Sequence, residues 1–194
     1  MPIADRGAAE AAQLIAGALE SAGLPYAIGG ALALAIAGVP RGTADVDINV
    51  FVAEHDVPTV VAVLQRLGVE VDLTSAVARA KRDGMFVGRW DGMRIDVFLP
   101  SIPFSHEAAR TRVRVTDAAG WSGWFLSAEA LAVFKLLFFR GKDVVDLERL
   151  VAVAASRLDH GYVRRWMVEM MGEDDERVRR WDDLVARFGP AATG

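Results

Sequence analysis

Polar residues alternate with apolar ones in the first part of the segment 44–52, where Asp45, Asp47 and Asn49 are separated by Val46 and Ile48. Successive side chains of a strand point to opposite faces, so this alternation predicts a β-strand with all three polar side chains on one face. The two aspartates then lie about 6.6 Å apart along the strand. Carboxylates that close repel each other and resist ionisation unless a cation lies over them. The segment therefore predicts either a cation site or a solvated, exposed sheet face.

A second segment repeats this pattern around a third carboxylate. Asp96 alternates with apolar neighbours in Arg94-Ile95-Asp96-Val97-Phe98, and Asp91-Gly92 joins this segment to the run before it. An Asp-Gly pair between two alternating runs is a strong hairpin signal. If the hairpin lies beside the segment 44–52, Asp96 joins Asp45 and Asp47. Three carboxylates suit two Mg²⁺ ions, or Mn²⁺ in their place, that also hold phosphate oxygens.

The remaining patterns predict an α+β fold followed by a helical region. Apolar periodicity and Gly or Pro punctuation predict strands at 26–28, 44–52, 69–73, 85–90, 93–99, 113–116 and 123–126. The same signals predict helices at 8–22, 31–37, 57–67, 128–140, 144–158, 162–171 and 174–188. We therefore expect a small sheet with flanking helices in residues 1–126 and a helical bundle in residues 127–190.

Composition excludes several classes of function. The chain of 194 residues has no cysteine, which excludes disulfides, thiolate catalysis and Cys-type zinc sites. Its formal net charge of −4 argues against a protein that coats nucleic acid. Local basic segments at 81–82, 110–114 and 164–180 could still form a groove for RNA. The uncharged stretch 21–40 contains Pro25 and four glycines, so we expect no membrane span and a cytoplasmic protein.

Gly29 and Gly30 lie between a predicted strand and a predicted helix. Glycine lets a ligand approach the backbone closely, and the N-terminus of a helix favours anions. This arrangement suits a triphosphate, although two glycines at such a position can also form a simple turn. A phosphate site and a carboxylate pair would together make a site for a metal-bound nucleotide.

These motifs resemble those of the nucleotidyltransferase superfamily, which has the DNA polymerase beta-like fold. The stretch AIGGALALAIAGVPRGTADVDI and the later RIDVF carry the resemblance, and KLLFFRGKDVVDLERL extends it toward the AbiEii/AbiGii-toxin type. Together these stretches span residues 27–150. Many relatives have serine where this chain has Gly30, and the glycine removes a hydroxyl that helps to hold phosphate.

The resemblance implies roles for individual residues. It assigns Asp45 and Asp47 to the metal ions, and Asp96 to the same ions and to the base that deprotonates an incoming hydroxyl. The remaining implied residues would lie near the nucleotide: Gly29 and Gly30 face the triphosphate, and Arg41 and Thr43 shape the loop before the strand or contact phosphate.

Lys135 is surrounded by apolar residues in LAVFKLLFFR. Burying an unpaired ammonium is costly, so its side chain either extends to solvent or meets an anion, for which a nucleotide phosphate would serve. On this second interpretation, Lys135→Met weakens NTP binding with little loss of stability. Lys142, Asp143 and Asp146 follow as accessory candidates. Both aspartates are expected in the first turn of a helix, where the helix dipole favours acids without any catalytic role.

The resemblance implies an enzyme that moves a nucleoside monophosphate from an NTP to an acceptor hydroxyl and releases pyrophosphate. Toxin-type relatives use the 3′ end of tRNA as acceptor, which would make this chain the toxin of a pair with a cognate antitoxin protein. Alternative acceptors are an antibiotic or a protein side chain. A nucleotide-binding module without turnover and a kinase-like phosphotransferase are the alternatives of another class, and a kinase would release NDP instead of pyrophosphate.

Overall fold

The computed structural model describes residues 7–189. The chain divides into two compact units, of which the first contains residues 1–32 and 42–126 and the second contains residues 33–41 and 127–194. Sequence analysis assigned residues 33–41 to the first region, whereas the structure groups them with the second unit. The outer ends of the two expected regions, residues 1–6 and residue 190, lie outside the described residues.

A mixed six-stranded sheet forms the centre of the first unit, with strand order β3-β4-β2-β1-β6-β5. The strands are β1 (Tyr26–Ile28), β2 (Asp45–Val50), β3 (Met85–Trp90), β4 (Met93–Phe98), β5 (Val113–Thr116) and β6 (Ser122–Phe125). Strand β2 lies between β4, to which it is parallel, and β1, to which it is antiparallel. With the helices described below, this confirms the expected α+β class.

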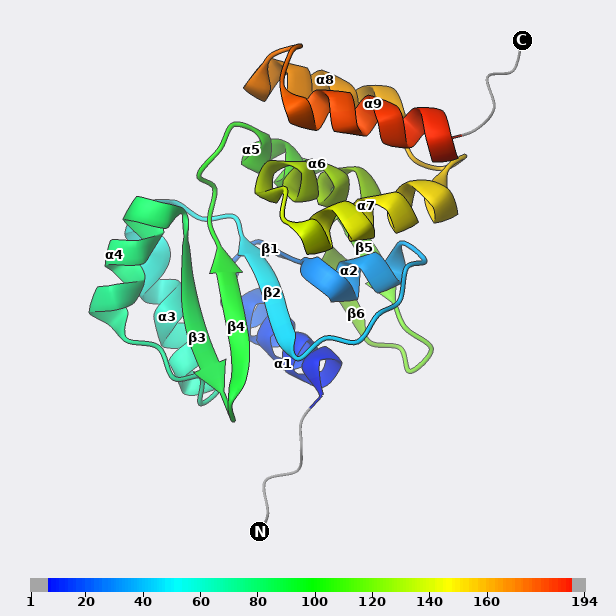
Figure 1. Ribbon diagram of the computed structural model, residues 1–194. Coiled ribbons are helices and arrows are strands. Elements are labelled where there is room, and N and C mark those ends of the chain that lie inside the picture. Colours follow the sequence, from blue (N-terminus) through cyan, green and yellow to red (C-terminus); the bar gives the residue numbers. More distant parts are fainter. Residues whose placement is uncertain (1–6, 190–194) are drawn as a thin grey trace. The chain divides into compact units, whose positions relative to one another are not determined.

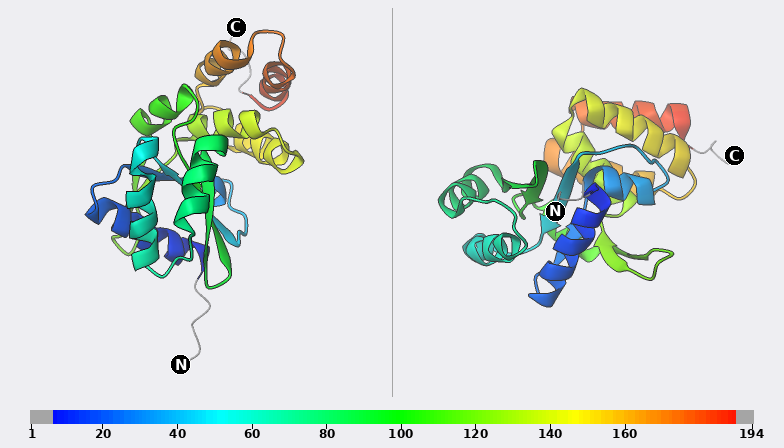
Figure 2. Two further views of the ribbon diagram at one scale, coloured as in Figure 1. Left: turned by 90° about the vertical axis from the view of Figure 1, so that its left-hand side faces the viewer. Right: turned by 90° about the horizontal axis from the view of Figure 1, so that it is seen from below.

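One face of the sheet is covered by α1 (Ala8–Ser21), α3 (Val57–Arg66) and α4 (Leu73–Asp83) (Figures 1 and 2). Val46 and Ile48 of β2 are fully buried on that side, as are Ile95 and Val97 of β4. Burial of each of these side chains stabilises the folded state by about 1.5–3 kcal/mol. The alternation of β2 therefore forces its polar residues onto the opposite face.

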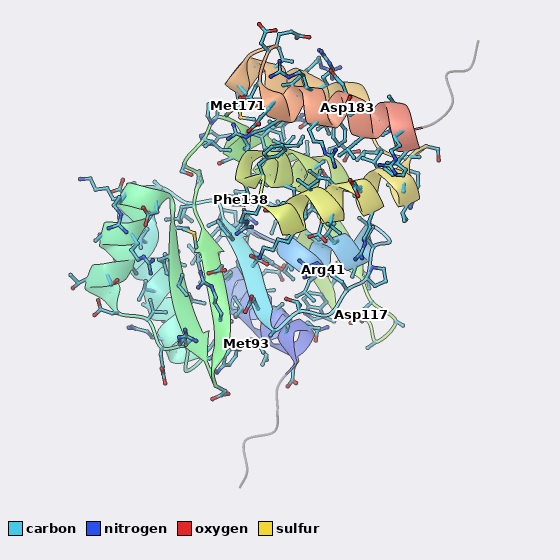
Figure 3. All side chains as sticks on the ribbon, viewed as in Figure 1. Arg41, Met93, Asp117, Phe138, Met171 and Asp183 are labelled. Carbon is cyan, nitrogen blue, oxygen red and sulfur yellow. The ribbon has the colours of Figure 1, made fainter. Side chains whose placement is uncertain are left out.

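The β3–β4 hairpin confirms the prediction from Asp91-Gly92. Trp90 pairs with Met93, and the two residues between them have φ angles of 50° and 83°. Positive φ at both central residues is what a two-residue type I′ turn requires. Figure 3 labels Met93 at this end of the hairpin.

Two helices of the first unit were not predicted from the sequence. Helix α4 replaces the end of the strand expected at 69–73, of which only a single bridge from Glu70 to Arg89 remains. The Asp72 carboxylate accepts a hydrogen bond from the Ser75 amide at the start of α4, and left-handed Gly84 ends it. The other missed helix is α5 (Phe104–Arg110). Helix α5 has only seven residues, and the apolar stripe of α4 consists mostly of alanine, so neither gives a strong apolar signal.

Four helices make up most of the second unit: α6 (Ala128–Phe138), α7 (Gly141–Ala154), α8 (His160–Met171) and α9 (Glu176–Phe188). Residues 33–36 belong to the last turn of α2 (Gly30–Ile36), which begins in the first unit. The helix expected at 128–140, with Gly141 after it, is shorter: α6 ends at Phe138 and is followed by Phe139, which is left-handed with φ 51°. No helix among residues 7–189 is long and apolar enough to cross a membrane.

Candidate active site

Strands β2 and β4 bring the three candidate carboxylates onto one face. Asp47 lies opposite Asp96 in the parallel register, and Asp45 lies opposite Arg94. Neighbouring strands are about 4.8 Å apart, and residues in register point to the same side of the sheet. Asp45 is exposed, whereas Asp47 and Asp96 are half-buried. The structure thus places Asp96 beside the aspartates of β2, on the face opposite the packed helices.

Arg94 provides a positive charge over this face. Its Nε donates to both carboxylate oxygens of Asp96, over 2.8 and 3.0 Å. The hydrogen bond to Asp96 and the charges of Asp96, Asp45 and Asp47 raise the pKa of Arg94 above its ordinary value, against the opposing effect of burial. The sequence pattern predicted no role for Arg94. Its position two residues before Asp96 could have indicated one, because residues two apart on a strand share a face.

We expect Arg94→Gln to lower the thermal unfolding midpoint in EDTA and to tighten Mn²⁺ binding. The carboxylates would lose a nearby cation while their mutual repulsion remained, which favours any other cation over them. Thermal unfolding and Mn²⁺ titration followed by electron paramagnetic resonance measure the two effects. Arg149→Gln removes an exposed charge from α7 and serves as the matched control. Unchanged or weaker Mn²⁺ binding would show that Arg94 supports the site instead of competing with a metal ion.

The glycine pair allows β2 to approach the start of α2. Gly30 has φ 54°, and a Cβ added there would lie 1.8 Å from Asp47 Oδ2. A Cβ on Gly29 would lie 2.9 Å from Asn49 Nδ2, and the Gly29 amide donates to the Asp47 carbonyl oxygen over 2.8 Å. The serine that many relatives have at position 30 would meet the Asp47 carboxylate in this arrangement. The absence of a side chain at Gly30 is therefore required by the position of Asp47.

Gly30→Ala should lower the free energy of unfolding by about 1–3 kcal/mol, because it adds strain at a left-handed residue and displaces the Asp47 carboxylate. Urea unfolding measures this loss. Gly42→Ala is the control, since a Cβ there meets nothing within 4 Å. Equal stability of the two variants would mean that Asp47 moves away without cost.

The donor set on this face suits a hard divalent ion, because Asp45, Asp47 and Asp96 offer only carboxylate oxygens. Within residues 7–189, however, no group of three or more His, Cys, Asp or Glu side chains is arranged to hold a metal ion. Both oxygens of Asp96 accept hydrogen bonds from Arg94. The residues therefore fit Mg²⁺ by their chemistry, and binding through all three requires Asp96 to share its oxygens with Arg94 or to leave it.

A second charged cluster lies within the second unit, around Lys135. Its Nζ is 2.6 Å from Asp146 Oδ2 and 3.5 Å from Asp143 Oδ1. Lys135, Asp143 and Asp146 are only 6%, 2% and 3% exposed. The interpretation in which Lys135 extends to solvent is therefore wrong. The Lys135 ammonium pairs with two carboxylates of α7, so its burial does not by itself require a nucleotide phosphate.

Two arginines complete this cluster. Arg140 Nε donates to Asp143 Oδ2 over 2.7 Å, and Arg41 Nη2 donates to Asp146 Oδ2 over 3.3 Å. Burial alone would raise the pKa of Asp143, but the Arg140 hydrogen bond and the Lys135 charge hold that pKa below its ordinary value. Asp143 also accepts from the Arg140 amide, as expected in the first turn of a helix. Asp146, in contrast, lies in the second turn, so the expectation of a first-turn position was wrong for it.

The remaining candidates divide between the two units. Thr43 Oγ1 donates to the Asp45 carbonyl oxygen over 3.0 Å and accepts from the Asp45 amide over 3.2 Å, so it shapes the entry to β2. Arg41, labelled in Figure 3 on the segment that joins α2 to β2, belongs to the second unit. Lys142 is exposed on the first turn of α7. The first unit thus brings together Asp45, Asp47, Asp96, Thr43 and the glycine pair.

Comparison with solved structures identifies the fold. No family model matches the sequence, and no curated protein matches it. The chain is similar to the antibiotic-resistance factor ANT(2'')-Ia in complex with adenylyl-2''-tobramycin, with a TM-score of 0.53 and 18% identity over 90% of this chain and 95% of that one. It is also similar to the solution structure of ANT(2'')-Ia, with a TM-score of 0.51 and 15% identity over 90% and 87% of the two chains. This chain therefore has the fold of ANT(2'')-Ia.

Proposed function

We propose that the protein transfers a nucleoside monophosphate from an NTP to an acceptor hydroxyl and releases pyrophosphate. The observation that carries the proposal is the register of β2 and β4, which places Asp96 opposite Asp47 on the polar face of the sheet. The glycine pair at the start of α2 lies against the same carboxylate. Carboxylates beside a backbone without side chains are what a metal-bound triphosphate needs.

Each residue then has a role in the transfer. Asp45, Asp47 and Asp96 would hold Mg²⁺, which when bound neutralises the charge on the attacking and leaving oxygens. Asp96 takes the proton of the acceptor hydroxyl, whose oxygen forms a bond to the α-phosphorus. The bond from that phosphorus to the oxygen bridging to the β-phosphate breaks, and pyrophosphate leaves. Without a metal ion, Arg94 holds Asp96 through two hydrogen bonds, and Asp96 would share its oxygens with Arg94 or leave it when Mg²⁺ binds.

Two of the three expected acceptor classes are favoured by an observation, and a protein side chain is the third class. The AbiEii/AbiGii-type resemblance of the sequence favours the 3′ end of tRNA, with a cognate antitoxin as partner. The fold shared with ANT(2'')-Ia, whose structure contains adenylyl-2''-tobramycin, favours an aminoglycoside as the alternative. A non-catalytic nucleotide-binding module on this fold would bind NTP without turnover. The toxin role and the cytoplasmic location stay predictions of the sequence.

Incubation with Mg²⁺, each α-labelled NTP in turn, and either total tRNA or tobramycin tests the proposal. We expect the label to appear in one acceptor and pyrophosphate to be released in equal amount. Label in RNA assigns the tRNA class, and label in tobramycin assigns the antibiotic class. NDP in place of pyrophosphate would identify a kinase, and NTP binding without any product would identify a module without turnover.

A further inference from the structure

A cavity of the first unit is lined by basic residues from separate parts of the chain. Its volume is about 710 Å³, within the range of pockets that hold small organic ligands. It lies where β2 and β4 end, next to the last turn of α4 and to α5. Figure 1 shows that the carboxyl ends of β2 and β4 and the end of α4 meet at one edge of the sheet. Asp47 lies about 13 Å back along β2 from Phe51 in the cavity wall.

The cavity wall contains more cations than carboxylates. Lys81, Arg82 and Arg112 line it together with Glu54 and Asp83. Arg82 donates to both oxygens of Asp83, over 2.9 and 2.7 Å, so these two charges compensate each other. Lys81 is exposed and forms no ion pair with any residue that the structure describes. The positive charges of Lys81 and Arg112 therefore exceed the one negative charge of Glu54 in the cavity wall.

Arg112 is held in place by aromatic rings. Its guanidinium carbon lies 4.7 Å from the centre of the Trp124 ring and 5.9 Å from that of Phe51. Nη1 donates to the Ala109 carbonyl oxygen over 3.2 Å, but the buried Nε has no hydrogen-bond acceptor among residues 7–189. Buried polar groups in folded proteins nearly always have a partner, so this guanidinium keeps donor capacity that the described residues do not use. A guanidinium held by stacking loses little entropy when it binds an oxyanion through two hydrogen bonds.

We propose that this cavity binds a phosphate group, with Arg112 as the principal donor and Lys81 as a second cation. The proposal goes beyond the transfer reaction and does not depend on it, because the cavity contains none of the residues assigned to catalysis. Two sources of phosphate share this chemistry. One is the phosphodiester backbone of a single-stranded RNA, and the other is a small oxyanion such as pyrophosphate.

Binding in EDTA without NTP tests the cavity separately from catalysis. A labelled single-stranded RNA of ten nucleotides is titrated with the protein by fluorescence anisotropy, and pyrophosphate is titrated by calorimetry. We expect Arg112→Gln to weaken binding of the true ligand about tenfold, the loss typical of a hydrogen bond to a charged group. Arg112→Lys keeps the charge but loses the planar guanidinium, which donates two parallel hydrogen bonds and stacks on the aromatic rings. It should therefore also weaken binding.

Lys81→Ala is the variant that cannot harm the fold, because its side chain is exposed. We expect it to weaken binding and, for RNA, to reduce the slope of log affinity against log salt by about 0.7, which corresponds to one phosphate contact. Arg66→Gln removes a charge from the end of α3, away from the cavity lining, and should change neither quantity. RNA binding that depends on Arg112 assigns the site to single-stranded RNA, and pyrophosphate binding alone assigns it to a small oxyanion. The proposal is overturned if neither probe binds, or if Arg66→Gln weakens binding as much as Lys81→Ala.

Discussion

Asp47→Asn lowers the rate of nucleotide transfer by at least about 10³-fold, a loss of about 4 kcal/mol of transition-state stabilisation. The substitution keeps the size and shape of the side chain, which lies close to Gly30. It removes one of the three negative charges that would hold Mg²⁺ on the polar face of β2 and β4. Transfer of label from α-labelled NTP to the acceptor measures the rate.

The same variant keeps its fold. Replacing one of the mutually repelling carboxylates relieves repulsion, so we expect a thermal unfolding midpoint in EDTA that is unchanged or higher. Asp45→Asn should behave in the same way, since Asp45 is exposed on the same strand. Asp183→Asn removes an exposed carboxylate from α9 and should leave both activity and stability unchanged. A collapse of the unfolding transition in Asp47→Asn, or full activity, would show that Asp47 serves the fold and not the chemistry.

Lys135→Met lowers the free energy of unfolding by about 3–5 kcal/mol, as expected when one partner of a buried ion pair is removed. Lys135 is 6% exposed and contacts both Asp143 and Asp146. The substitution leaves two buried carboxylates with fewer positive partners, although Arg140 and Arg41 remain beside them. This expectation replaces the one from the sequence, in which the same variant loses NTP binding but little stability. Urea unfolding in EDTA measures the change.

Two further variants separate charge pairing from packing. Asp146→Asn added to Lys135→Met removes one of the two buried carboxylates that lost the Lys135 charge, so the double variant should recover part of the lost stability. Lys142→Met changes an exposed lysine seven residues further along the chain and should be neutral. If Lys135→Met instead unfolds like the wild type and binds NTP more weakly, the ammonium serves the nucleotide and the buried cluster is secondary.

Local patterns were sufficient for most elements of the fold. The alternation in β2 and the Asp91-Gly92 turn depend on neighbours within a few residues, and the structure confirms both. Helix α4 was missed because the side chains that it buries, Ala76 and Ala80, are small and six of its eleven residues are polar, so the apolar run 69–73 before it dominated the local pattern. The end of α6 was misplaced because left-handed Phe139, and not a glycine, terminates it.

The candidate site, like the fold, was predicted only in part from the sequence. The sequence by itself determined that Asp45 and Asp47 share one face of a strand and that Asp96 alternates with buried neighbours, because side-chain direction in a strand follows from period two alone. Only the tertiary structure decided that β4 lies beside β2 in the register that pairs Asp96 with Asp47. Only the tertiary structure also decided that the anions of Lys135 are Asp143 and Asp146. The physical reason is that strand order depends on residues far apart in the chain, and the pairing of Lys135 depends on how α6 packs against α7. Both are decided only when the core excludes water.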